Sequence, residues 1–210
     1  DIFLGGQVTR QSIRLMPRER VHHFGIEWKP SGIYKLFKID MRRSANNFLD
    51  IADLITSKEY EALYRVFSED YDFEDQCAQL NQFFLDKLPI SKKCQKVDQA
   101  LQIINEEINK ITINEIAKTV YLSTRQLRRN IKKTCGITPQ AYQNIVQMNK
   151  IYKLIEQEEY RRMEDLAYQC GYFDVSHFIN SFKKRMNSNP SVYIESGGSF
   201  ISTYIKHSKR

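Results

Sequence analysis

The sequence predicts a mainly α-helical protein, in which a C-terminal all-α domain follows a smaller α+β domain. Through most of the chain after Ser31, apolar residues recur at spacings of three and four, the period of an amphipathic helix. Near the N-terminus, β-branched and aromatic residues instead alternate or cluster, as they do in strands. One helical pattern in the C-terminal half also occurs twice, with the two copies about 50 residues apart. These observations indicate two domains of different architecture.

The charge of the chain is unevenly distributed. Residues 1–90 contain 12 Lys and Arg against 14 Asp and Glu, whereas residues 91–210 contain 20 against 11. With 41% hydrophobic residues and few Pro and Gly, the chain has the composition of a globular protein. A basic part beside a slightly acidic part is typical of a polyanion-binding module joined to a module with another task.

Cysteine and histidine usage argues against metal, cofactor and disulfide chemistry. The chain has four histidines and four cysteines, and no two cysteines form a CxxC pair. We therefore expect no metal site, no disulfide framework and a reducing, cytoplasmic location. We assign no cofactor and no catalytic residue to the sequence. No apolar run approaches the roughly 18 residues of a membrane span, so no membrane partner is expected. Because the sequence begins at Asp1 within strand-like sequence, we expect the first domain to be truncated.

The predicted first domain, residues 1–90, is a regulatory or dimerisation domain that begins with strands. Strands are expected over Arg10–Met16 and Val21–Trp28, with Pro17 between them. The pattern then changes to short helices, predicted over Gly32–Phe37, Phe48–Ile55 and Tyr60–Phe67.

The acidic stretch Glu69–Asp75 opens a further predicted helix. Pro89 ends it, and Ile90–Lys93 is the expected linker to the second domain, residues 91–196, beyond which residues 197–210 form a tail. The apolar stripe of this helix consists of Cys77, Leu80, Phe83, Phe84 and Leu88.

The second domain is expected to be helical almost throughout. Its first helix is predicted over Val97–Ile108, and a long helix over residues 139–156, with Thr138 as its N-cap and Pro139 at the first helical position. The repeated pattern flanks this long helix. It predicts one helix-turn-helix at about residues 113–134 and another at about 163–186.

The two copies of the repeat align at many positions. Glu115–Ala117 in the first copy corresponds to Asp165–Ala167 in the second, and Pro139 corresponds to Pro190. The small alanine in the first helix of each copy allows a second helix to cross closely, as a helix-turn-helix requires. Each copy also carries a Lys-Lys pair near the end of its second helix, so the chain is predicted to contact a repeating polyanion twice.

The second helix of the first copy is predicted to run from the N-cap Ser123 to about Thr134, with Gly136 ending it. Leu127 and Ile131 face the core, which leaves a basic face outward. Arg and Gln can bind base edges through two hydrogen bonds, and Lys suits phosphates. The predicted DNA-contacting residues are Ser123, Thr124, Arg125, Gln126, Arg128, Arg129, Lys132 and Lys133.

The second helix of the second copy is predicted from Asp174 or Val175 to Met186, with Phe178 and Phe182 inward and Asn187 in place of the glycine stop. Its outward set also includes Ile179 and Arg185 and holds fewer arginines in the first turns. We therefore expect the first copy to carry more base specificity, and the second to anchor mainly on the DNA backbone. The predicted DNA-contacting residues are Asp174, Ser176, His177, Asn180, Lys183 and Lys184.

Many spaced positions of the two copies match a known pattern. In the second copy these are the block Ala167–Phe178, then Phe182–Lys184 and Pro190–Tyr193. In the first they are Leu122, Ser123, Leu127, Arg129, Lys132, Gly136, Ile137, Thr138, Pro139 and Tyr142. Over residues 92–196 the sequence thus resembles the AraC/XylS-type bacterial transcription regulators. The resemblance implies two helix-turn-helix subdomains that place recognition helices in successive major-groove faces, about 34–36 Å apart.

Two positions depart from the family pattern. Asn180 stands where an outward arginine is common, which puts base reading by that helix in doubt, and Ile131 replaces a core phenylalanine. Residues 24–32 more weakly resemble the end of a regulatory domain that, in the family, senses a small molecule or dimerises. The resemblance therefore implies double-stranded promoter DNA as partner, with RNA polymerase, an unknown small-molecule effector and a second copy of the chain as further candidates.

The leading hypothesis is a sequence-specific regulator of transcription that binds double-stranded DNA and has no catalytic activity. One alternative is the DNA-binding part of a DNA-repair methyltransferase, but those enzymes need a reactive cysteine followed closely by histidine and arginine. Neither Cys77 nor Cys94 has such neighbours. A second alternative is a helical protein-interaction module without sequence-specific DNA binding, against which the doubled basic pairs argue.

Overall fold

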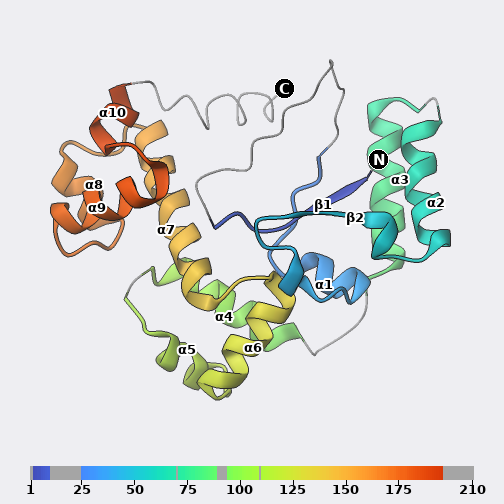
Figure 1. The fold of residues 1–210 in the computed structure, drawn as a ribbon, viewed down its shortest axis with the longest axis horizontal. Helices are drawn as coiled ribbons and strands as arrows, with labels where there is room; N and C mark the ends of the chain where they lie inside the picture. The colour runs from blue at the N-terminus through green and yellow to red at the C-terminus, as the bar shows by residue number, and fades with distance from the viewer. Residues whose placement is uncertain (1, 10–24, 70, 89–93, 109, 196–210) are drawn as a thin grey trace.

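The computed structural model describes residues 2–9, 25–69, 71–88, 94–108 and 110–195. Within these ranges the protein is mainly helical, and its short strands lie in the N-terminal part. A long central helix, α7 (Pro139–Glu156), has a group of helices at each of its two ends (Figure 1). The N-terminal elements lie beside the group that precedes α7 in the chain.

The N-terminal part is built around a small antiparallel sheet of β1 (Phe3–Gly5) and β2 (Phe48–Asp50), in which Leu4 pairs with Leu49. Leu4 is buried together with Ile33, Met41 and Ile51. Three short helical segments accompany the sheet: α1 (Gly32–Phe37), as predicted, and the 3₁₀ helices η1 (Met41–Arg43) and η2 (Ile51–Asp53).

Two predictions for this part of the chain are wrong. The helix predicted over Phe48–Ile55 is instead strand β2 followed by η2. Pairing with β1 extends the chain there, and the Asp50 carboxylate accepts a hydrogen bond from the Ala52 amide at 2.9 Å, which starts the 3₁₀ turn. The strand predicted over Val21–Trp28 is not a strand at its described end. The rest of it, and the strand predicted over Arg10–Met16, lie outside the described residues.

Helices α2 (Ser57–Ser68) and α3 (Phe73–Asp86) form a hairpin at the end of the molecule away from the helices that follow α7 (Figure 1), and α3 contacts Phe37 of α1 through Phe83 and Phe84. An ion pair between Lys87 and Glu59 joins them, and the hydrogen bond from Lys87 holds the pKa of Glu59 at about 2. Leu88 was predicted in the buried stripe of α3 but lies beyond the helix and is 56% exposed. The residues buried between the two helices are Leu63, Val66 and Leu80.

The first core of the C-terminal part lies among α4 (Gln95–Glu106), α5 (Ile113–Thr119), α6 (Thr124–Cys135) and the start of α7. Apolar side chains at spacings of three and four supply one face of each helix. The largest contributions come from Val97, Leu101, Ile104, Ile116, Leu127, Ile131 and Tyr142.

The second core lies among the end of α7, α8 (Met163–Gln169), α9 (Val175–Met186) and α10 (Pro190–Glu195). Helix α7 contributes to both cores and therefore sets the distance between them. The predicted linker Ile90–Lys93 lies outside the described residues, as does the predicted tail. No helix in the described ranges combines the length and apolarity needed to cross a membrane. The second core consists mainly of Met148, Ile151, Leu154, Leu166, Phe178, Phe182 and Tyr193.

Candidate nucleic-acid interface

In the first helix-turn-helix, α5 and α6 are set at an angle by a short turn. Tyr121 in this turn has a positive φ of 54°, and its amide donates to the Lys118 carbonyl at 3.0 Å, which ends α5 and redirects the chain. Ile116 and Ala117 of α5 are buried against Leu127 of α6. Because Ala117 has only a methyl group, the two helices approach closely at this point.

Helix α6 begins with the predicted cap. The Ser123 hydroxyl accepts from the Gln126 amide at 3.2 Å, and the Gln126 Oε1 accepts from the Ser123 amide at 2.9 Å, so the two residues form a capping box. The acceptor end of Gln126 is thus occupied, and its amide nitrogen is the end left to meet a base. The Thr124 hydroxyl is similarly engaged with Asn114 Oδ1 at 2.8 Å.

The exposed face of α6 is strongly basic. The helix turns its apolar residues inward and leaves five cations and no acidic side chain along its own length. Lys132 and Lys133 lie in the last turn of the helix, where cations also interact favourably with the helix dipole. The exposed cations are Arg125, Arg128, Arg129, Lys132 and Lys133.

The second helix-turn-helix has the same plan. Gly171, with φ of 76°, occupies the position that Tyr121 has in the first unit. The Asp174 carboxylate caps α9 by accepting from the His177 amide at 2.7 Å, and the His177 ring packs edge-on against Tyr172 at a centroid distance of 5.3 Å. Asn187 ends the helix in the left-handed conformation predicted for it, with φ of 52°. The same scaffold is therefore built from a different set of residues.

Helix α9 exposes a shorter list of groups than expected. Ile179 packs against the second core, and the Arg185 guanidinium donates to the Asn144 carbonyl of α7 at 2.7 Å. Placing these two residues on the outward face was therefore wrong: the sequence could not show that α7 passes beside this turn of the helix. Burial lowers the pKa of Arg185, as expected of a cation used structurally. The residues exposed on α9 are Ser176, His177, Asn180, Lys183 and Lys184.

Two buried glutamines attach α7 to both units. The Gln143 amide donates to the Ile111 carbonyl before α5 at 3.4 Å, and the Gln147 amide donates to the Cys170 carbonyl at the end of α8 at 2.9 Å. Buried amides are retained where they are hydrogen-bonded. These contacts fix both units to one helix, although neither glutamine stood out in the sequence.

The geometry above agrees with comparison to known proteins. A family model of a helix-turn-helix domain matches residues 116–196. The transcriptional activator RhaS of Escherichia coli is 33% identical over 82 residues, which are 39% of this chain and 29% of RhaS. Residues 116–196 are a helix-turn-helix domain of the AraC/XylS type. The chain thus spans less than a third of the length of this relative.

Two solved structures are similar to about half of this chain. One is the C-terminal domain of AraT, a response regulator from Geobacillus stearothermophilus, with a TM-score of 0.47 and 26% identity over 50% of this chain and 88% of that one. Another is an AraC-type transcriptional regulator from Chromobacterium violaceum, with a TM-score of 0.44 and 23% identity over 49% and 92% of the two chains.

The cysteines of the AraC/XylS-type domain pack in its cores. Cys135 and Cys170 are almost fully buried, which confirms the prediction that they are small buried residues. Burial raises the pKa of both thiols to about 11. A nucleophilic cysteine needs the opposite shift, because the thiolate is the reactive form.

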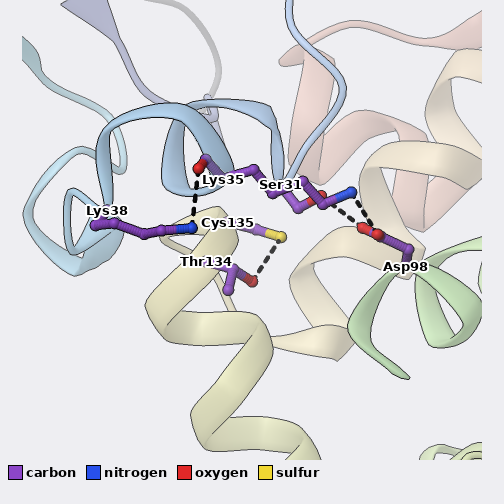
Figure 2. Close-up of polar contacts among 6 residues, drawn as sticks. All are labelled: Ser31, Lys35, Lys38, Asp98, Thr134 and Cys135. Atoms are coloured by element: carbon purple, nitrogen blue, oxygen red, sulfur yellow. Dashed lines mark hydrogen bonds and ion pairs between the residues drawn. The ribbon is translucent and has the colours of Figure 1, made fainter. Parts of the chain in front are cut away.

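The N-terminal part packs on α4 and on the end of α6, the recognition helix of the first unit. The Ser31 hydroxyl donates to Asp98 of α4 at 2.6 Å, and Lys35 forms an ion pair with the same carboxylate (Figure 2). At the end of α6, Gly136 lies so close to η1 that an added Cβ would be 2.5 Å from the Met41 carbonyl oxygen. No local sequence pattern predicted this contact, since it depends on two segments about 95 residues apart.

Proposed function

We propose that this chain is a transcription regulator that binds double-stranded DNA in a sequence-specific manner, without catalytic activity of its own. The observation that supports this most directly is the pair of helix-turn-helix units on one helix, each with an exposed basic recognition helix. Phosphate contacts from Lys and Arg supply salt-dependent affinity, and base contacts supply specificity. The domain organisation we propose is a regulatory part at residues 1–90 and a DNA-binding domain at residues 91–196.

In this proposal α6 and α9 have different tasks. Arg125, Arg128 and Arg129 of α6 read base edges in the major groove, assisted by the free amide of Gln126, because arginine makes two hydrogen bonds to guanine. The other groups position the protein on the DNA backbone or make weaker base contacts. On α6 they are Ser123, Thr124, Lys132 and Lys133, and on α9 they are Asp174, Ser176, His177, Asn180, Lys183 and Lys184.

The relatives extend the proposal to transcription. RhaS is named a transcriptional activator, and the helix-turn-helix family model matches residues 116–196, which include both recognition helices. We infer that this chain acts in the cytoplasm at promoter DNA and that RNA polymerase is a partner at the promoter. A small-molecule effector or a second copy of the chain would act through residues 1–90.

A titration with duplex DNA tests the proposal. The parent protein should bind a selected duplex in a gel shift, and log K should fall linearly with log salt concentration. Lys183→Ala should weaken binding to all duplexes alike and reduce the salt slope by about 1, because it removes one phosphate contact. Lys58→Ala, which removes an exposed lysine of α2, is the matched control and should leave both quantities unchanged.

The same titration separates the proposal from its alternatives. If the parent protein showed no affinity for duplex DNA even at low salt, the alternative of a helical protein-interaction module would be favoured over the proposed function. Transfer of a methyl group from alkylated DNA onto the protein would instead support the methyltransferase reading.

A further inference from the structure

A basic pocket of about 740 Å³ lies where the N-terminal part meets the recognition helix of the first unit. It is bounded by α1 and η1 on one side and by the C-terminal half of α6 on the other. Figure 2 shows Lys38 of the N-terminal part running alongside the end of α6, where Thr134 lies. The volume falls within the range of ligand pockets, roughly 300–1,000 Å³.

Four cations from two distant parts of the sequence line this pocket. Lys38 and Arg42 come from the N-terminal part, and Arg129 and Lys133 come from α6. Two of them lie over the Tyr34 ring, with the Lys38 Nζ 5.9 Å and the Lys133 Nζ 5.6 Å from its centroid. Among the described residues that line the pocket none is acidic.

One nearby carboxylate balances part of this charge. Asp40 accepts hydrogen bonds from the Arg42 guanidinium at 2.6–3.0 Å. The hydrogen bond from Arg42 is the main cause of the lowered pKa of Asp40, and the charge of Lys133 contributes less. Asp40 offsets one of the four cations that the described lining contributes, so this lining keeps a positive excess, which favours an anion.

We propose that this pocket binds a phosphate group, supplied by the backbone of the DNA strand that flanks α6. The proposal rests on the proposed function. It adds that the N-terminal part, through Lys38 and Arg42, belongs to the DNA-binding surface and not to a separate regulatory module alone.

The position of the pocket on α6 points to backbone phosphate. Arg129 and Lys133 are four residues apart, so they lie one turn apart on the same edge of the helix. A helix in the major groove has a phosphate strand along each edge, and the edge formed by these two residues is the one that η1 faces. In this pocket the phosphate ligands are Lys38, Arg42 and Lys133, of which Arg42 can form two parallel hydrogen bonds, while Arg129 keeps the base contact proposed for it above.

The test compares two neighbouring arginines of η1. Arg42 lines the pocket, whereas Arg43 is exposed in the same short helix and does not line it. Arg42→Ala should weaken duplex binding about two- to fivefold and reduce the salt slope by about 0.9, because one phosphate contact is lost. Arg43→Ala should leave both at the parental values.

A third variant works in the opposite direction. Asp40→Asn removes the competing charge but keeps a side-chain oxygen that caps η1, so Arg42 is released without loss of the turn. This variant should bind the same duplex about two- to fivefold more tightly than the parent.

A second arm identifies the source of the phosphate. Inorganic phosphate and pyrophosphate are titrated into the DNA-free protein, and their effect on thermal stability is compared among the parent, Arg42→Ala and Arg43→Ala. Stabilisation that is lost in Arg42→Ala, together with an unchanged DNA salt slope, would assign the pocket to a free phosphate compound and overturn our assignment to DNA. If Arg42→Ala and Arg43→Ala behaved identically in both arms, the proposal that this pocket binds a phosphate group would be wrong.

These outcomes are distinguishable from failure of the proposed function. If the parent does not bind duplex DNA at all, the proposed function is wrong and the DNA part of this inference falls with it. If the parent binds DNA and Arg42→Ala matches Arg43→Ala, the proposed function stands and the phosphate site is wrong.

Discussion

The two helix-turn-helix units share a scaffold but differ in what they present. At equivalent positions, the first has Arg125, Arg128 and Arg129, and the second has Ser176, Ile179 and Asn180. One pair of equivalent positions differs in role as well as in residue type, because Arg128 is exposed whereas Ile179 packs against the core. The buried residues of a repeated motif therefore preserve the fold, while the outward residues are free to diverge in function.

The units also differ in their neighbours. The N-terminal part covers the end of α6 and touches Gly136, whereas α9 ends at Asn187 and is flanked by α7 and α10. A signal received by the N-terminal part would thus reach the first unit directly and the second only through α7. The unit that we propose to read more bases is the one in contact with the N-terminal part.

The largest expected effect concerns the two cores, which we expect to be separately stabilised. Phe178→Ala should lower the free energy of unfolding by about 3–5 kcal/mol and Leu127→Ala by about 2–5 kcal/mol, because both side chains are fully buried. Urea denaturation measures these losses. In hydrogen exchange, Phe178→Ala should expose mainly α8 and α9, and equal loss of protection in α5 and α6 would show that the cores behave as one.

The next largest effect distinguishes the helix ends. Gly136→Ala should lower the free energy of unfolding by more than about 2 kcal/mol. Its φ of 82° is unfavourable for alanine, and the new Cβ would collide with the Met41 carbonyl. Asn187→Ala should cost about 1 kcal/mol or less, because asparagine already bears the same strain. Thermal unfolding gives both values, and equal costs would argue against tight packing of η1 on α6.

A smaller effect is expected on DNA affinity at matched positions. Arg125→Ala should weaken binding to the preferred duplex by about 1–3 kcal/mol if the arginine makes a bidentate base contact. Ser176→Ala, at the equivalent position of α9, should weaken it by less than about 1 kcal/mol. Fluorescence titrations at one salt concentration measure both, and a larger loss for Ser176→Ala would reverse the assignment of roles.

The smallest effect tests whether the scaffolds are equivalent. Ser123 and Asp174 each cap a recognition helix through a side-chain oxygen. Ser123→Ala and Asp174→Ala should therefore each cost about 1 kcal/mol of stability. Chemical denaturation of the two variants side by side provides the measurement. If their losses in the free energy of unfolding differed by more than about 1 kcal/mol, the N-caps of α6 and α9 would not be equivalent.

Local features of the fold were predictable because they depend on neighbouring residues. The cap at Ser123, the cap at Thr138 and the left-handed stops at Gly136 and Asn187 were all predicted and are confirmed. Each depends on the conformational preference of one or two side chains. For the same reason the apolar spacing correctly indicated that Leu127 and Ile131 of α6 and Phe178 and Phe182 of α9 are buried.

Features that depend on distant segments were not predictable. Strand β2 replaces a predicted helix because it pairs with β1, more than 40 residues earlier in the chain. The structural role of Arg185 and the contact of η1 with Gly136 likewise require segments that only the folded chain brings together. The predicted DNA-contacting residues are mostly exposed on the two helices, but contact with DNA stays a prediction.

A selection of bound sequences from random duplex DNA tests the central claim most directly. We predict that the parent recovers one strongly defined short motif and, about one helical turn away, a weakly defined one. In the double variant Arg125→Ser, Arg129→Asn, which gives α6 the residues of α9 at these positions, the strong motif should disappear while general affinity for DNA persists. Two motifs of equal strength in the parent, or a strong motif that survives in the double variant, would contradict the division of roles between the two units.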